Sequence, residues 1–136
     1  MILEIITPEK ILLKEEIDEI IVPTVTGEIA ILPNHVPLVT QIVEGELMVK
    51  KGAKLYSLAI TGGFMQVLKN QVSILANFAI RAEDIEVAKV EEAKKRAEAL
   101  MKEKATDRDF RIAEAELIKS IVQLRVATKY KHRRPL

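Results

Sequence analysis

The order of hydrophobic and polar residues divides this chain into two unlike parts. In residues 1–80, short runs of Ile, Val and Leu alternate with turn residues at close, regular intervals, which predicts the strands of an antiparallel β-sandwich. In one run Leu47 and Val49 recur with a period of two and are expected to point inward. The predicted strands span residues 2–6, 10–13, 17–22, 28–32, 38–43, 46–50, 54–60, 64–68 and 71–76.

Glycine and proline follow the same division. All five glycines and four of the five prolines lie before residue 64. Because these residues mark turns, Glu44-Gly45 and Gly62-Gly63 are predicted to separate strands. The runs 19–22 and 58–60 are apolar on both faces, so we expect part of the sandwich surface to meet another protein.

The second part predicts two helices. Residues 84–104 are rich in Ala, Glu, Lys and Arg, with a thin apolar face through Ile85, Ala88, Ala93, Ala97 and Leu100. A second helix is expected from about 107 to 130, with Thr106 and Asp109 resembling a capping box at its start. Its main stripe comprises Phe110, Ala113, Leu117, Ile121 and Leu124, widened by Ile118, Val122 and Val126.

The link between the helices is short, which predicts an antiparallel hairpin. The expected fold class is therefore α+β in two parts. Residues 1–80 form an N-terminal antiparallel β-sandwich, and residues 81–136 form a C-terminal antiparallel two-helix hairpin.

Composition argues against several kinds of chemistry. The chain has no cysteine, and its two histidines, His35 and His132, lie far apart, so we expect no disulfide, thiol chemistry or metal site. Gly62-Gly63 lacks the Lys-Ser/Thr of a phosphate-binding loop, and no serine sits in a nucleophile elbow. We therefore predict no catalytic residue. Because neither a long apolar run nor a secretory pattern is visible, we expect a soluble, intracellular protein.

The net charge of +1 hides an asymmetry: residues 1–80 carry −3 and residues 81–136 carry +4. After Glu116 no acid follows, whereas six cations do: Lys119, Arg125, Lys129, Lys131, Arg133 and Arg134. Some of them suit the helix dipole, and so many together also indicate an acidic partner surface. The alternative is a nucleic-acid-binding β domain with a basic hairpin, although the aromatic content of 4% argues against it.

Six segments carry a more specific pattern. They are Val22-Pro23 through Gly27-Glu28-Ile29, then residues 31–38 (Ile-Leu-Pro-Asn-His-Val-Pro-Leu), 61–67 (Thr-Gly-Gly-Phe-Met-Gln-Val), 72–76, 81–85 and 123–127. In this order and spacing they resemble the epsilon subunits of F-type ATP synthases over essentially the full chain.

The resemblance implies a non-catalytic rotor subunit of a complex that makes ATP from ADP and phosphate with a proton gradient. In that family the sandwich attaches to the gamma shaft and to the proteolipid ring in the membrane. The hairpin either folds onto the sandwich or extends along gamma into the alpha/beta head, where it blocks hydrolysis. The implied location is peripheral, on the cytoplasmic face of the bacterial inner membrane or on a chloroplast thylakoid, and membrane association comes only through the complex.

The resemblance also assigns residues. Glu28 and His35 would contact the proteolipid ring, and Pro33 and Pro37 would keep the His35 loop rigid. A purely structural role for His35 remains open as well. In the extended state a basic group would face the acidic rim of the beta subunit: Lys119, Arg125, Lys129, Arg133 and Arg134.

Some bacterial members bind ATP at the hairpin through Ile/Leu-Asp-x-x-Arg-Ala. The matching positions here are Ile85, Glu86 and Lys89, and Val90 closes the motif. Lysine lacks the planar fork with which arginine grips phosphate. The assisting arginines of the second helix correspond here to Lys119 and Gln123. We therefore expect weak or absent ATP affinity, no other cofactor and no nucleic-acid partner.

Overall fold

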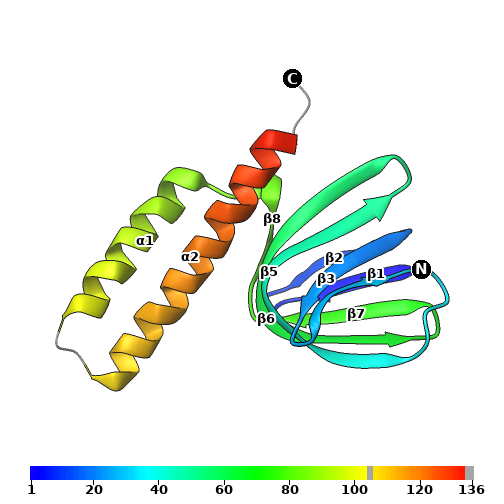
Figure 1. Cartoon of the computed structure of the whole chain (residues 1–136), viewed down its shortest axis with the longest axis horizontal. Helices are drawn as coiled ribbons and strands as arrows, with labels where there is room; N and C mark the ends of the chain where they lie inside the picture. The colour runs from blue at the N-terminus through cyan, green and yellow to red at the C-terminus, as the bar shows by residue number, and fades with distance from the viewer. Residues whose placement is uncertain (104–105, 134–136) are drawn as a thin grey trace.

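The computed structural model describes residues 1–103 and 106–133, and side chains as far as His132. A folded sheet lies beside a pair of antiparallel helices (Figure 1). The strands are β1 (Ile2–Ile6), β2 (Ile11–Glu16), β3 (Glu19–Thr24), β4 (Gly27–Ile31), β5 (Leu38–Lys51), β6 (Lys54–Leu68), β7 (Gln71–Ala76) and β8 (Ala79–Arg81). A 3-10 turn η1 (Ala82–Asp84) leads to α1 (Val87–Lys102) and α2 (Asp107–Arg133).

The strands pair in the order β2-β1-β7-β6-β5-β3-β4, and β8 pairs with β6 beyond the end of β7. The sheet folds over on itself, so that its two halves enclose a core as in a sandwich (Figure 1). All pairings are antiparallel except that of β1 with β7, which is parallel. The predicted fold class, a β-sandwich followed by two helices, is confirmed.

The predicted turns at Glu44-Gly45 and Gly62-Gly63 are wrong. β5 and β6 run through both positions and stay paired, with Ile42 opposite Gly63 and Gly45 opposite Ile60. At these glycines the paired strands bend and continue, and no turn separates them. Gly63 has a φ of 136°, and a Cβ there would lie 2.0 Å from the carbonyl oxygen of Leu75 on β7. Only glycine allows the two strands to approach so closely.

The bend also changes which residues point inward. Leu58 and Ile60 face the core before it, and Met65 and Val67 do so after it, so the inward positions change from even to odd numbers. Leu47 and Val49 are fully buried, as their alternation predicts. Every buried member of this core lies between Met1 and Ala79, and none comes from either helix. The sandwich therefore closes its own interior.

The two helices form the expected antiparallel hairpin, but the buried positions on α1 differ from the predicted ones. The hydroxyl of Thr106 accepts a hydrogen bond from the backbone N–H of Asp109 at 3.2 Å, which confirms the cap at the start of α2. In α1, Ala97 is buried as predicted, whereas Ala88 is exposed and Val90 is buried. The face that packs against α2 is therefore rotated from the predicted one.

In α2 the prediction ranked the apolar positions incorrectly. Val122 and Val126, which were expected only to widen the stripe, are almost completely buried, whereas Phe110 of the main stripe is exposed. Ile118, the third residue expected to widen the stripe, is exposed as well. The reason is that α2 touches α1 on one side and the sandwich on another, so its buried surface is not a single stripe.

Candidate functional site at the hairpin–sandwich interface

A small apolar cluster joins α2 to the sandwich. Ala59 on β6, Ala82 in η1, and Val122 and Val126 on α2 are buried together. Three partly buried side chains, Ile80, Ile85 and Tyr130, pack against them. Strand segment 58–60 was expected to leave apolar surface for another protein, but its outward residue Ala59 is covered by the chain's own hairpin.

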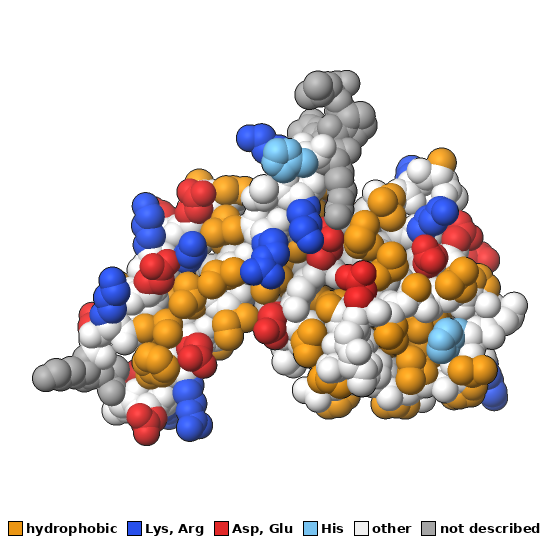
Figure 2. All heavy atoms as spheres, viewed as in Figure 1, with side chains coloured by type: hydrophobic (Ala, Val, Ile, Leu, Met, Phe, Trp, Pro, Cys, Tyr) orange, Lys and Arg blue, Asp and Glu red, His pale blue; other side chains and the backbone are white. Residues whose placement is uncertain are grey.

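Apolar surface is exposed elsewhere on the sandwich. Val39 on β5, Phe64 on β6 and Leu75 on β7 are 70%, 57% and 58% exposed. Phe64 is paired with Leu75, and Val39 lies on the next strand, so the three line one shallow hollow on the outer face. Hydrophobic side chains gather over the lower part of the sandwich in Figure 2. These three neighbouring apolar side chains are a candidate contact surface.

Two lysines of α2 reach over to the sandwich. Nζ of Lys129 lies 3.8 Å from Oε1 of Glu46 on β5, and the Glu46 side chain is only 11% exposed. Nζ of Lys119 lies 4.1 Å from the ring centroid of Phe78, in the connection between β7 and β8. Figure 2 shows basic and acidic side chains meeting along this interface. The folded arrangement thus engages two of the five cations predicted to bind a partner.

The other predicted cations are placed as follows. Arg125 is exposed on α2, and the backbone of Arg133 ends that helix. Arg134 lies outside the described residues.

The residues of the degenerate nucleotide motif are only partly brought together. Nζ of Lys89 lies 2.7 Å from Oε2 of Glu86, and the hydrogen bond and charge of this carboxylate raise the pKa of Lys89. Ile85 packs against the apolar cluster instead. Gln123 is buried and its amide donates to the carbonyl oxygen of Lys119 at 3.3 Å. In the described parts of the chain, no hydrogen bond or ion pair links Glu86 or Lys89 to α2.

The two predicted ring-contact residues lie at opposite ends of β4. Glu28 is exposed near the strand's start, opposite Pro23, and His35 lies in the loop that follows the strand. Nδ1 of His35 is 2.7 Å from the carbonyl oxygen of Val36. The loop is tied to the β6–β7 turn, because the N–H of Asn34 donates to the Asn70 side chain at 2.9 Å.

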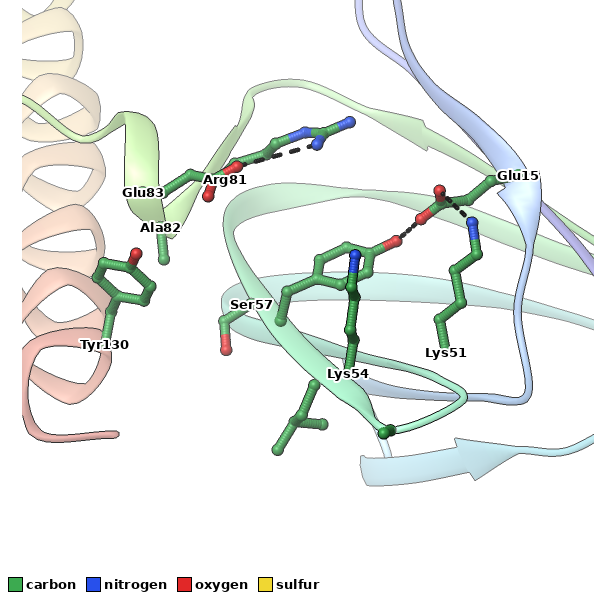
Figure 3. Close-up of a pocket in the computed structure, with 11 residues that line it drawn as sticks. Glu15, Lys51, Lys54, Ser57, Arg81, Ala82, Glu83 and Tyr130 are labelled. Carbon is green, nitrogen blue, oxygen red and sulfur yellow. Dashed lines mark hydrogen bonds and ion pairs between the residues drawn. The ribbon is translucent and has the colours of Figure 1, made fainter. Parts of the chain in front are cut away.

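A hollow of about 670 Å³ lies beside the interface, between the end of α2 and the β5–β6 turn (Figure 3). Several of its charged groups pair with one another, and Lys54 lines it as well. Glu15 accepts from the Tyr56 hydroxyl and from Lys51, and Arg81 lies 4.0 Å from Glu83. Tyr130 lines the hollow from α2. Packing between hairpin and sandwich is therefore incomplete on this side.

Within residues 1–103 and 106–133, no three His, Asp or Glu side chains gather to hold a metal ion. Over the same residues, neither helix combines the length and the apolar character needed to cross a membrane.

Sequence reasoning missed Glu46 and Phe78 as contact residues. Glu46 precedes the alternating run that contains Leu47 and Val49, and this period predicts only that it points away from the core. Its partner lies 83 positions later in the chain. No local pattern signals a contact over that distance.

A β-sandwich that closes its own core and carries a helical hairpin against its outer face defines a two-part α+β protein. Two family models match the chain: the ATP synthase Delta/Epsilon chain beta-sandwich domain over residues 1–82, and the ATP synthase Delta/Epsilon chain long alpha-helix domain over residues 83–128. The chain belongs to the ATP synthase delta/epsilon family, which confirms the resemblance.

Its relatives include the ATP synthase epsilon chains of Dehalococcoides mccartyi and Desulforamulus reducens. The first is 44% identical over 128 residues, which cover 93% of this chain and 91% of the relative. The second is 42% identical over 125 residues, which cover 92% and 95%. These relatives are non-catalytic subunits of the synthase, and so is this chain.

Two solved structures contain a chain with a similar fold. A chain of the Euglena gracilis mitochondrial ATP synthase (OSCP/F1/c-ring in rotational state 1) matches with a TM-score of 0.65 and 27% identity, covering 97% of this chain and 79% of that one. A chain of the Tetrahymena thermophila mitochondrial ATP synthase central stalk/c-ring matches with a TM-score of 0.58 and 14% identity, covering 93% and 95%, and shows the fold alone.

Proposed function

We propose that this chain is a rotor subunit of the central stalk of an F-type ATP synthase. Its sandwich attaches to the gamma subunit and the proteolipid ring, and its hairpin inhibits ATP hydrolysis by extending into the alpha/beta head. One observation carries the proposal: the core of the sandwich contains no hairpin residue, so the hairpin can leave without opening that core.

The size of the interface supports a movable hairpin. Its buried apolar residues are two valines and two alanines, and a fully buried valine contributes roughly 1.5–3 kcal/mol. Moving an equilibrium from 1:99 to 99:1 takes about 5.5 kcal/mol of differential interaction. A partner surface that buries a similar stripe and pairs several cations can therefore compete with the sandwich.

The outer face of the sandwich supports its role as the anchor. Val39, Phe64 and Leu75 offer an exposed apolar area for gamma. Glu28 and the tethered loop with His35 are candidates for the polar loops of the proteolipid ring. Association with the membrane, on the cytoplasmic face of a bacterial inner membrane or on a thylakoid, then comes only through the complex.

The candidates for the acidic rim of the head are the cations of the C-terminal basic group: Lys119, Arg125, Lys129, Arg133 and Arg134. ATP binding at Ile85, Glu86 and Lys89 is proposed to be weak or absent. In support, Glu86 and Lys89 pair with each other, and both are exposed to water. Family membership favours this whole interpretation over a nucleic-acid-binding hairpin.

The test removes residues 85–136 and leaves β8 and η1 in place. The truncated chain is expected to assemble with gamma and the proteolipid ring, and the complex should hydrolyse ATP faster than the complete one while still coupling to protons. Loss of assembly would mean that the essential contacts lie in the hairpin, and the proposal would be wrong.

A further inference from the structure

Two polar contacts flank the apolar cluster along α2. Lys119 precedes Val122 and Val126, and Lys129 follows them, so the lysines are ten residues or about 15 Å apart along the axis. Each meets a different element of the sandwich, Phe78 after β7 or Glu46 on β5. The helix is therefore held at two separate points outside its apolar contact.

The Glu46 contact is not an ordinary surface pair. Its carboxylate side chain is only 11% exposed, whereas that of Lys129 is 49% exposed. A carboxylate with little water around it attracts a cation more strongly than a fully exposed one. The ring of Phe78 offers Lys119 a second attraction, through the negative face of its π-system.

We propose that Glu46 and Phe78 are a docking surface for the basic side of α2, which competes with the catalytic head for the same lysines. This inference rests on the proposed function, because it concerns the regulation of that hairpin. An ammonium group that lies against Glu46 or Phe78 in the folded state cannot also pair with an acidic partner. Strengthening one contact therefore weakens the other.

The competition predicts that variants of the sandwich residues and variants of the lysines change the ratio of open to folded hairpin differently. Glu46 and Phe78 act only in the folded state, so replacing either one raises the open population. In the assembled synthase Lys129 contributes to both states, so replacing it destabilises both and changes the ratio of extended to folded hairpin less. A contact that merely supported the fold would not separate these two classes of variant.

The experiment uses the full chain in isolation and exploits its lack of cysteine. Glu9→Cys and Glu98→Cys place dyes on exposed positions of the sandwich and of α1, and energy transfer between them gives the distance distribution. Glu46→Gln and Phe78→Leu are each expected to raise the ratio of open to folded hairpin by about two- to fivefold. Salt should reduce the difference between wild type and Glu46→Gln.

The matched control is Glu44→Gln, an exposed acid on the same strand. It should leave the distance distribution unchanged. Equal distributions for Glu46→Gln and Glu44→Gln would overturn the assignment of Glu46. In the assembled synthase, Glu46→Gln should lower ATP hydrolysis more than Lys129→Gln does, and the reverse order would contradict the competition.

One further variant separates failure of this inference from failure of the proposed function. Val126→Asp places a charge in the apolar cluster, at a side chain 1% exposed, and leaves the core of the sandwich untouched. If it opens the hairpin while Glu46→Gln and Phe78→Leu do not, the docking surface is wrong and the movable hairpin stands. If no variant changes the distance, the hairpin does not move and the regulatory proposal fails.

Discussion

The two parts of this molecule are stabilised in different ways. The sandwich has a continuous interior in which Leu3, Ile20, Leu47 and Ile74 are fully buried. In α1, by contrast, only Val90 and Ala97 are buried. The difference shows that the sandwich is stable through its own interior, whereas the hairpin depends on the surface against which it packs.

Apolar side chains are also exposed at the end of the hairpin where α1 leads into α2. Leu100, Phe110 and Ile112 are exposed there by 47%, 40% and 54%. Two of them line a hollow of about 270 Å³ between α1 and α2, together with several alanines. The helix pair therefore buries much less apolar surface of its own than the sandwich does.

The largest expected effect comes from emptying the sandwich core. Leu47→Ala removes a side chain with no exposed surface, and we expect the free energy of unfolding to fall by about 2–5 kcal/mol. Chemical denaturation followed by circular dichroism measures it. Leu100→Ala, at an exposed position of α1, is the control and should change stability little. Equal losses for both would remove the contrast between the two parts.

The bend in the long strands gives the next largest effect. Gly63→Ala brings a methyl group against the backbone of Leu75 and forces a non-glycine residue to a φ of 136°, which we expect to cost about 3 kcal/mol of stability. Gly52→Ala, with a φ of 60° and no atom within 4 Å, should cost about 1 kcal/mol. Thermal melts compare the two; a smaller loss for Gly63→Ala would show that the sheet can rearrange.

This bend marks the limit of prediction from sequence. Alternation was enough to predict the sandwich and the inward direction of Leu47 and Val49. It could not show that Gly62-Gly63 lies inside one strand, because glycine is favoured both in turns and where two backbones approach closely. The parallel pairing of β1 with β7 was equally hidden, since it joins segments about 70 residues apart.

The run of cations without acids after Glu116 predicts an acidic partner surface, and this stays a prediction. Helical periodicity could not identify Glu46 or Phe78 as its folded-state partners, because periodicity gives the face of a helix and says nothing about the surface opposite. Such contacts follow from the tertiary packing.

A smaller effect is expected at the interface itself. Val126→Ala removes the equivalent of two methylene groups from a buried position, which costs about 1–2 kcal/mol. Hydrogen exchange should show faster exchange along α2 and unchanged protection in β5 and β6. The control is Ile118→Ala on the exposed side of α2. If sandwich protection falls together with that of α2, the two parts unfold as one unit and the hairpin does not open independently.

The smallest effect concerns the nucleotide. The wild-type chain is expected to show no saturable heat with ATP up to millimolar concentration, because Lys89 is hydrogen-bonded to Glu86, and because Lys119 and Gln123 replace the assisting arginines. Lys89→Arg combined with Glu86→Asp restores the fork at one of these positions only, so we expect affinity to rise by no more than about tenfold. Lys95→Arg, elsewhere on α1, is the control and should leave the affinity for ATP unchanged.

Low-micromolar ATP binding by the wild-type chain would contradict this prediction and show that a lysine can replace arginine at this motif. The hairpin would then have a ligand that holds it folded in addition to its contacts with the sandwich.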